Sequence, residues 1–252
     1  MADRTAHVPR ERRDRTAAAR AAFEGVLREV FDGVAVLAGL AGALHRAAAA
    51  EGRSPASGEL AAIRPTVLAR LTAPGGVLAG TGVIAAPDVL ADRSRWLEWW
   101  RLPHDRTGEP YPLSVDLDPY SVGGYEYPAA EWFEIPHRTG RRAVVGPYVD
   151  YAGTDEYILT FSAPVLGEAG FFGVAAADVR ATDLERAALP LLHATGPGTL
   201  LVNLSGRVLA SNTPAVVAGS LAPSGHRAGE ALPSGEEWHE CAGLPWSLVR
   251  TE

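Results

Sequence analysis

The chain has 252 residues, an apolar content of 47% and a formal net charge of −7. This length allows one large domain or two small ones with an ample core, and the acidic balance argues against general nucleic-acid binding by the whole chain.

The N-terminal region does not resemble a secretory signal peptide, because its first twenty residues are charged and no apolar segment follows them directly. The most apolar stretch, residues 33–44, is shorter than the ~20 residues that a membrane-spanning helix needs. The single cysteine, Cys241, excludes an internal disulfide. These features predict a soluble cytoplasmic protein without a membrane span.

Residues 1–15 are expected to form a disordered, basic-leaning tail, and residues 16–52 a long helix. Apolar side chains in the second stretch recur at spacings of three and four, which aligns them in one stripe. Thr16 is the expected N-cap, and Gly52 followed by Pro55 marks the end. The helix either connects two modules or forms a homodimer through its apolar stripe; both interpretations stay open.

After a Ser/Pro/Gly linker, residues 59–71 are expected to form a second amphipathic helix with Pro65 in its first turn or at the end of a short turn before it. Residues 75–85 are rich in glycine but fit neither phosphate-loop pattern, so they predict a strand interrupted by glycines. Residues 96–101 are expected to form a helix whose tryptophans share one face, either as core or as part of a ligand cage.

Residues 125–179 contain short β-rich runs broken by Gly and Pro, which predict consecutive antiparallel strands at 125–136, 144–150, 157–165 and 171–179. A helix is expected at 182–193, with Thr182 as its cap and Glu185 as the capping-box partner. A hairpin over 199–211 that turns at Ser205-Gly206, and strands at 238–242 and 246–250, predict a second, smaller sheet. A module boundary is expected near residue 195.

The order of these elements resembles the double Cache sensor family, whose members have a long N-terminal helix, a larger PAS-like module and a smaller one. The resemblance is strongest in residues 125–184, through Trp132-Phe133, the run Gly146-Pro147-Tyr148-Val149-Asp150, Ser162-Ala163-Pro164-Val165, and Gly173-Val174 with Asp178-Val179. It implies an α+β fold with a pocket-bearing Cache module over residues 53–195 and a smaller PAS-like module over residues 196–252.

Family members that recognise amino acids carry a tyrosine, an arginine five residues later, a tryptophan, an adjacent aromatic residue and an aspartate after the Gly-Val strand. The matching positions here are Tyr125, Ala130, Trp132, Phe133 and Asp178. In the family the aspartate binds the ligand's ammonium group and the arginine binds its carboxylate. The resemblance therefore implies an amine-binding end, whereas Ala130 stands where the carboxylate-binding arginine is expected.

A buried carboxylate between aromatic faces also suits an alkylammonium ion on chemical grounds, through a charge-assisted hydrogen bond and cation–π contacts. Asp178 with Trp132 and Tyr125 fits this chemistry, and Asp150 offers a second carboxylate. Structural roles stay open for three of these residues: Asp178 as a helix cap, Asp150 as a turn residue and Trp132 as core. The remaining candidate ligand-binding residues are Phe133, Tyr148, Trp100 and Arg101, the last as a substitute for the missing arginine.

The sequence thus predicts a non-enzymatic sensor or binding domain for an amine, an amino acid or a related small organic acid, with no cofactor and no metal. The seven histidines lack metal-ligand spacing, no Gly-x-Ser-x-Gly elbow occurs, and the paired carboxylates Asp116 and Asp118 lie in a loop-like stretch. The alternative is an interaction or dimerisation protein with a vestigial pocket.

Overall fold

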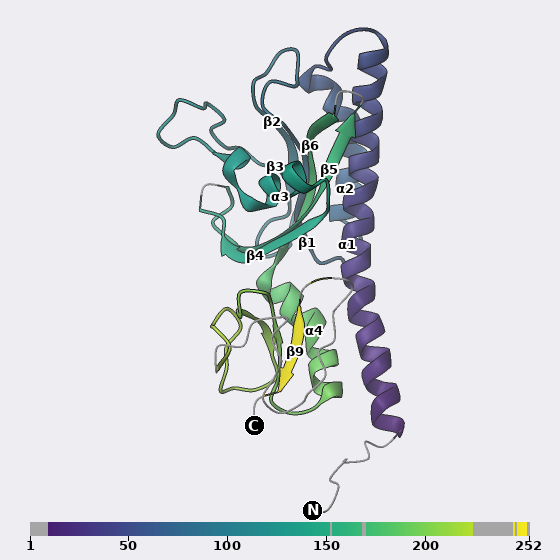
Figure 1. Cartoon of the computed structure of the whole chain (residues 1–252), viewed down its shortest axis with the longest axis vertical. Coiled ribbons are helices and arrows are strands. Elements are labelled where there is room, and N and C mark those ends of the chain that lie inside the picture. The colour runs from purple at the N-terminus through teal and green to yellow at the C-terminus, as the bar shows by residue number, and fades with distance from the viewer. Residues whose placement is uncertain (1–9, 152, 168–169, 224–243, 245, 251–252) are drawn as a thin grey trace, which may run out of the picture. The chain divides into compact units, whose positions relative to one another are not determined.

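The computed structural model describes residues 10–151, 153–167, 170–223, 244 and 246–250. The chain divides into two compact units: residues up to Arg28 with those from Ala181 onward form unit 1, and Glu29–Arg180 form unit 2 (Figure 1). The sequence placed a module boundary near residue 195, whereas unit 1 resumes at Ala181. A long N-terminal helix, a six-stranded sheet and a three-stranded sheet confirm the predicted α+β, PAS-like fold class.

The N-terminal helix, α1, runs from Arg10 to Ala50 and begins before the expected cap at Thr16. Thr16 lies inside the helix, and its Oγ1 donates a hydrogen bond to the carbonyl of Ala194 at 2.8 Å. Residues 10–15, expected in a disordered tail, are helical because they are mostly good helix formers without Gly or Pro; residues 1–9 lie outside the described part. Gly52, with φ of 71°, follows the helix end as predicted.

None of the helices in the described part of the chain combines the length and the apolar character that a membrane span requires.

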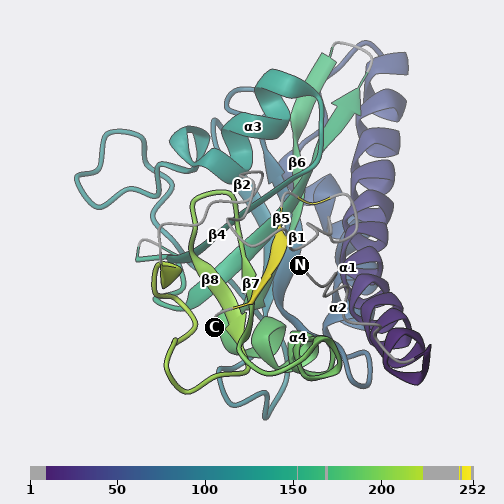
Figure 2. The ribbon, with the colours of Figure 1, turned by 60° about the horizontal axis from the view of Figure 1, so that its bottom comes forward.

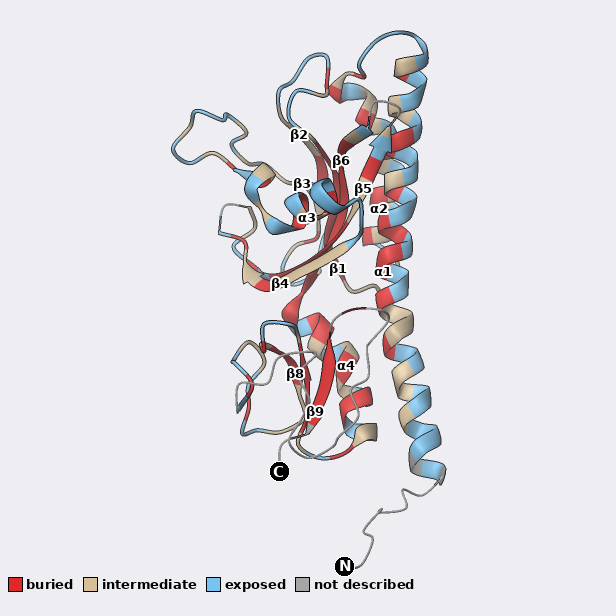
Figure 3. Ribbon diagram, viewed as in Figure 1, coloured by how far each residue is buried: buried red, intermediate tan, exposed pale blue. Residues whose placement is uncertain are grey.

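Unit 2 is built on an antiparallel sheet with the strand order β3-β2-β1-β6-β5-β4. Its strands are β1 (Leu78–Ala85), β2 (Trp96–Arg101), β3 (Tyr111–Pro112), β4 (Ala143–Val149), β5 (Tyr157–Gly167) and β6 (Gly170–Arg180). The strand predicted from the glycine-rich stretch is β1, and three of the runs predicted between residues 144 and 179 are β4, β5 and β6. The long central strands β1 and β6 are buried along most of their length (Figure 3).

Helices cover both faces of this sheet. On one face lies the unit 2 part of α1, whose Phe31 ring packs edge-on against Phe161 of β5 with the centroids 5.3 Å apart. The short helix η1 (Ser57–Ile63) and α2 (Arg64–Leu71) lie on the same face, where Arg64 stacks on Trp100. On the other face, α3 (Glu131–Thr139) covers β4, β5 and β6. The short helix η2 (Tyr127–Ala129) precedes α3, and its Tyr127 hydroxyl donates to the carbonyl of Ala85 in β1. The candidate pocket lies under α3.

Three expected elements differ in the structure: residues 96–101, residues 125–136 and the second amphipathic helix at residues 59–71. Residues 96–101 form strand β2 and not a helix, because the side chains alternate: Trp96, Glu98 and Trp100 share one face, and aromatic residues favour strands. Residues 125–136 do not form the first strand; they contribute to η2 and α3, where Trp132, Phe133 and Pro136 are buried on one helix face and Gly140 caps the end at φ of 65°.

The second amphipathic helix is divided into the 3₁₀ helix η1 and the α-helix α2, with Pro65 in the first turn of α2 as expected. Proline is tolerated there because its missing N–H has no partner in the first turn of a helix.

In unit 1, α4 (Ala181–Thr195) packs on a three-stranded antiparallel sheet of order β8-β7-β9 (Figure 2). The strands are β7 (Thr199–Val202), β8 (Val208–Ser211) and β9 (Ser247–Arg250). The predicted hairpin and final strand are confirmed. Thr182 lies inside α4 and does not cap it. The predicted strand at 238–242, with Cys241, lies outside the described residues.

Candidate ligand-binding site

One rung of the six-stranded sheet organises the site. Gly80 of β1 pairs with Arg101 of β2 on one side and with Asp178 of β6 on the other, and Asp178 pairs in turn with Thr160 of β5. Residues of one rung point to the same face of a sheet. Arg101, Asp178 and Thr160 therefore share the face that α3 covers.

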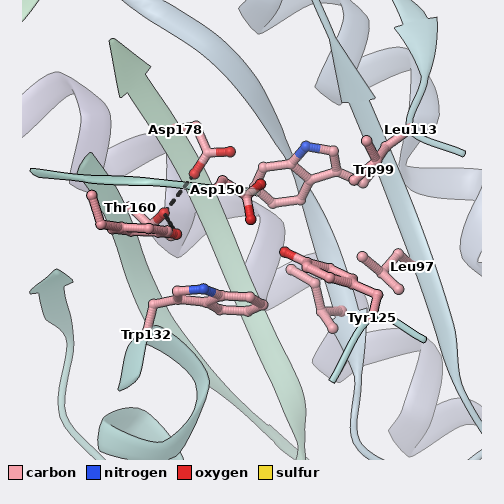
Figure 4. A pocket seen from close by; sticks show the side chains of 10 residues that line it. Leu97, Trp99, Leu113, Tyr125, Trp132, Asp150, Thr160 and Asp178 are labelled. Atoms are coloured by element: carbon pink, nitrogen blue, oxygen red, sulfur yellow. Dashed lines mark hydrogen bonds between the residues drawn. The ribbon is translucent and has the colours of Figure 1, made fainter. Parts of the chain in front are cut away.

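A cavity lies over this rung. The cavity is narrow, with a volume of about 10 Å³. A cavity of this volume holds about one water molecule, so side chains must move to admit an organic ligand. The lining residues come from five strands, from α3 and from the loops between them (Figure 4): Ile84, Leu97, Trp99, Leu113, Tyr125, Trp132, Tyr148, Asp150, Thr160 and Asp178.

Asp178 supplies a carboxylate at the bottom of the cavity. Its side chain is buried, with 6% of the residue exposed, and its Oδ1 accepts a hydrogen bond from Thr160 Oγ1 at 2.7 Å. Tyr148 Oη lies 2.7 Å from the same Thr160 oxygen. The threonine hydroxyl has a single proton, which it gives to Asp178, so Tyr148 donates to Thr160. A short chain of hydrogen bonds thus ends on the carboxylate, and Asp178 does not cap α4.

Burial raises the pKa of Asp178 from its ordinary value of 3.8 to about 8. The Thr160 hydrogen bond opposes this shift, because it stabilises the ionised form; nearby Asp150 adds to the shift, and Arg101 opposes it. A cation placed beside Asp178 would stabilise the ionised carboxylate, which burial disfavours.

Asp150, directly after β4, combines two of the roles considered from the sequence. Its Oδ2 accepts a hydrogen bond from the backbone N–H of Thr154 at 3.1 Å, as in an ordinary turn. The same side chain lines the cavity. Burial raises the pKa of Asp150 above its ordinary value, against the lowering effect of the Thr154 hydrogen bond. The pocket therefore holds two carboxyl groups, and a bound cation would stabilise the ionised form of each.

Aromatic side chains form the walls. Trp132 of α3 and Tyr125, which precedes η2, line the cavity together with Trp99 of β2. Figure 4 shows the Asp150 carboxylate and the Tyr125 hydroxyl directed into the space above the Trp132 ring. Burial, followed by the charges of Asp150 and Asp178, raises the pKa of Tyr125 above its ordinary value, which keeps its hydroxyl a hydrogen-bond donor.

Three candidate residues from the sequence do not line the cavity. Phe133 is behind the wall, where its ring packs edge-on against Trp132 and Tyr127. Trp100 points to the opposite face of the sheet, where its indole N–H donates to Glu98; this corrects the expectation that it belongs to the site. Arg101 is on the correct face but contacts Glu156 instead of the cavity.

Arg101 belongs to a buried charge cluster next to the pocket. Arg101 Nη2 lies 3.2 Å from Glu156 Oε1, and only 9% of the Glu156 side chain is exposed. Arg180, the last residue of β6, donates from Nη2 to Glu156 Oε1 at 3.1 Å and from Nε to Oε2 at 3.2 Å. Two arginines thus share one carboxylate.

The sequence did not single out four residues that line the cavity, Ile84, Leu97, Leu113 and Thr160, and it considered Trp99 only as one of the tryptophans of an expected helix. An available signal was the alternation of residues 96–101, which as a strand places Leu97, Trp99 and Arg101 on one face. The position of Thr160 beside Asp178 depends on strand register, which the sequence pattern does not contain.

Among the described residues, no group of three or more His, Cys, Asp or Glu side chains is arranged to hold a metal ion.

No protein-family profile matches the chain, and no curated protein matches it in sequence. Solved structures do match. A structure titled methyl-accepting chemotaxis protein X has a TM-score of 0.59 and 18% identity, over 82% of this chain and 75% of that one. The ligand-binding domain of the Pseudomonas fluorescens chemoreceptor CtaA, in complex with L-valine, has a TM-score of 0.56 and 16% identity over 93% of both chains. That of the Pseudomonas aeruginosa amino-acid chemoreceptor PctC, in complex with GABA, has a TM-score of 0.54 and 20% identity, over 93% of this chain and 94% of that one.

The chain therefore has the fold of chemoreceptor ligand-binding domains, and the resemblance to double Cache domains is confirmed at the level of the fold. A further match, at a TM-score of 0.54, is the extracellular domain of a candidate histidine kinase. The cytoplasmic location expected from the sequence stays a prediction.

Proposed function

We propose that this chain is a non-enzymatic sensor domain that binds a small organic ammonium compound, an amine or an amino acid, in the cavity beneath α3. The observation that carries the proposal is the buried carboxylate of Asp178, which lies beside a second carboxylate, Asp150, in a cavity whose described lining includes no cationic side chain.

The chemistry of the walls supports an ammonium ligand. A carboxylate buried in low dielectric gains from a charge-assisted hydrogen bond to N⁺–H, and the faces of Trp132 and Tyr125 attract a cation through their quadrupoles. Structures of the same fold carry amino compounds: GABA in PctC and L-valine in CtaA. Sensor domains bind such ligands without transforming them, in agreement with the absence of a catalytic motif from the sequence.

The carboxylate end of an amino acid finds no obvious partner in the described cavity. Ala130, at the position of the expected arginine, is the residue before α3, and Arg101 is paired with Glu156. The ammonium group of an amine therefore has its carboxylate partners in the cavity lining, whereas the carboxylate of an amino acid requires Arg101 to change its partner.

A thermal-shift screen of the purified chain against alkylamines, amino acids and short carboxylates tests the proposal. A ligand at a hundredfold excess over its dissociation constant stabilises the native state by about 2.7 kcal/mol, which raises the melting temperature by several degrees. We expect shifts with amines and their loss in Asp178→Ala, whose own unfolding stays cooperative. A shift that persists unchanged in Asp178→Ala refutes the site, and the absence of any shift refutes the function.

The second candidate function, an interaction or dimerisation protein with a vestigial pocket, is favoured by the narrowness of the cavity. Two apolar side chains of α1, Val36 and Leu40, are 49% and 39% exposed and fit a helix-mediated homodimer. Light scattering that gives a dimer broken by Leu40→Glu, together with a screen without any ligand, supports this alternative. A monomer that binds amines contradicts it.

A further inference from the structure

Arg101, a cation whose charge acts on both pocket carboxylates, does not line the candidate pocket. Arg101 is in the same sheet rung as Asp178, with only Gly80 between them, so their backbones are separated by about 10 Å. Gly80 has no side chain to separate the two groups. Arg101 is close enough to lower the pKa of both Asp150 and Asp178. It nevertheless does not line the cavity.

Glu156 is the group that holds Arg101. The Arg101 Nη2 atom lies 3.2 Å from Glu156 Oε1, and the Arg101 side chain is 12% exposed. Its guanidinium also stacks 5.5 Å from the centre of the Tyr111 ring. Glu156 lies next to Asp150, whose backbone N–H donates to the Glu156 carbonyl at 3.1 Å, and Tyr111 lies on β3, on the other side of β2. The Arg101 guanidinium is thus paired with Glu156 and stacked on Tyr111, neither of which lines the cavity.

Glu156 is itself fixed in place. Arg180 donates to both of its carboxylate oxygens, at 3.1 and 3.2 Å, and His104 Nδ1 lies 3.2 Å from Oε1. Arg180 Nη2 in turn donates to the backbone carbonyls of Leu102 and Pro103, which directly follow Arg101. The anion that pairs with Arg101 is therefore anchored to the segment that carries Arg101.

We infer that Glu156 is a specificity-determining positioning residue: by holding Arg101 out of the pocket, it makes the site select an organic ammonium ion without an adjacent carboxylate over the corresponding α-amino acid. The inference rests on the proposed function. An α-carboxylate in this cavity would lie beside Asp150 and Asp178 without a cation, and burying an unpaired charge is costly.

Removing the charge of Glu156 releases this restraint. In Glu156→Gln the side chain keeps its size and an acceptor for Arg180, but Arg101 loses its anion. The carboxylates of Asp150 and Asp178, on the same face, are then its alternative partners, so Arg101 competes with a ligand's ammonium group and offers a partner to a ligand's carboxylate.

The experiment is a calorimetric titration with butylamine and L-norvaline, which differ by one carboxylate, at pH 8.5. The wild type is expected to bind butylamine at least tenfold more tightly than L-norvaline. Glu156→Gln is expected to bind butylamine at least tenfold more weakly than the wild type does. The ratio of its dissociation constants for L-norvaline and butylamine is expected to be smaller than in the wild type. Because Glu156 acts through Arg101, the same substitution in an Arg101→Gln background is expected to change butylamine affinity by less than about threefold.

Glu59→Gln is the matched control, because Glu59 also accepts two hydrogen bonds from an arginine, Arg53, but at an exposed position of unit 2. Equal affinity of the wild type for the two ligands overturns the inference. This comparison uses the wild type alone, so it does not depend on the folding of any variant. An effect of Glu156→Gln that persists in the Arg101→Gln background also overturns it. A wild type that binds neither ligand refutes the proposed function itself, and the inference with it.

Discussion

The affinity of the pocket for an amine is expected to depend steeply on pH, because Asp178 must lose its proton to pair with an ammonium group. Burial raises the pKa of Asp178 from 3.8 to about 8 in the ligand-free protein. Below this value the amine has to displace a proton; above it the carboxylate is already ionised. An alkylammonium ion keeps its own proton up to a pH of about 10, as lysine does.

The magnitude follows from the titration of one group. With a pKa of about 8, about one molecule in a hundred carries ionised Asp178 at pH 6 and about nine in ten at pH 9. The dissociation constant for butylamine is therefore expected to fall about a hundredfold between pH 6 and pH 9, by about tenfold per unit in the lower part of that range.

Isothermal titration calorimetry measures this dependence directly. Titrations in two buffers of different ionisation enthalpy also count the protons released, which we expect to approach one per bound amine near pH 6. Asp178→Asn serves as the control, since it has no proton to release. A wild-type affinity that stays constant from pH 6 to pH 9, with no proton release, refutes the reasoning.

Three further outcomes are expected. Thr160→Val removes the hydrogen bond that lowers the pKa of Asp178, so the midpoint of the binding profile is expected to move to higher pH; an unchanged midpoint contradicts this. The pKa of Asp178 is higher in the folded than in the unfolded chain, so its protonated form stabilises the folded state. Without ligand, the free energy of unfolding of the wild type is therefore expected to fall between about pH 4 and pH 8, relative to that of Asp178→Asn, and to level off above pH 8. Urea titrations in which the difference in free energy of unfolding between the two proteins does not change with pH contradict this. Gly82→Ala places a Cβ against the carbonyl oxygen of Glu98, well inside van der Waals contact, and is expected to destabilise by at least ~2 kcal/mol. Gly39→Ala, on α1, places its Cβ in open space and is expected to stabilise by up to ~1 kcal/mol. Similar chemical-denaturation midpoints for the two variants argue against the β1–β2 register.

Much of the fold was predictable because local patterns and tertiary structure agree. The strands β4, β5 and β6 alternate or run apolar between glycines and prolines, and the stripe of α1 repeats at helical spacing. Short segments were harder. Residues 96–101 are too few for periodicity alone to separate a helix from a strand, and pairing with β1 decides the outcome. The run 125–136 has the aromatic content of a strand, but it buries one face against the sheet as η2 and α3.

The grouping of several candidate residues around one cavity was predictable from their chemistry, whereas the features that depend on strand register were not; ligand binding by these residues stays a prediction. Tyr125, Trp132, Tyr148, Asp150 and Asp178 lie together around one cavity. Trp99 was assigned to the same face as Trp100, an error that follows directly from treating β2 as a helix. The pairing of Arg101 with Glu156 joins segments far apart in the chain, and no sequence pattern indicates that this arginine is already occupied.

The most direct test of the proposed function is a comparison of butylamine binding by the wild type and by Asp178→Asn at pH 8.5, where most wild-type molecules carry the ionised carboxylate. Asparagine keeps the shape and the hydrogen-bonding capacity of the side chain but removes its charge. We predict that the wild type binds the amine and that Asp178→Asn, although at least as stable without ligand, loses at least a hundredfold in affinity. Equal affinity in the two proteins would contradict the assignment of Asp178 as the anchor of an ammonium ligand.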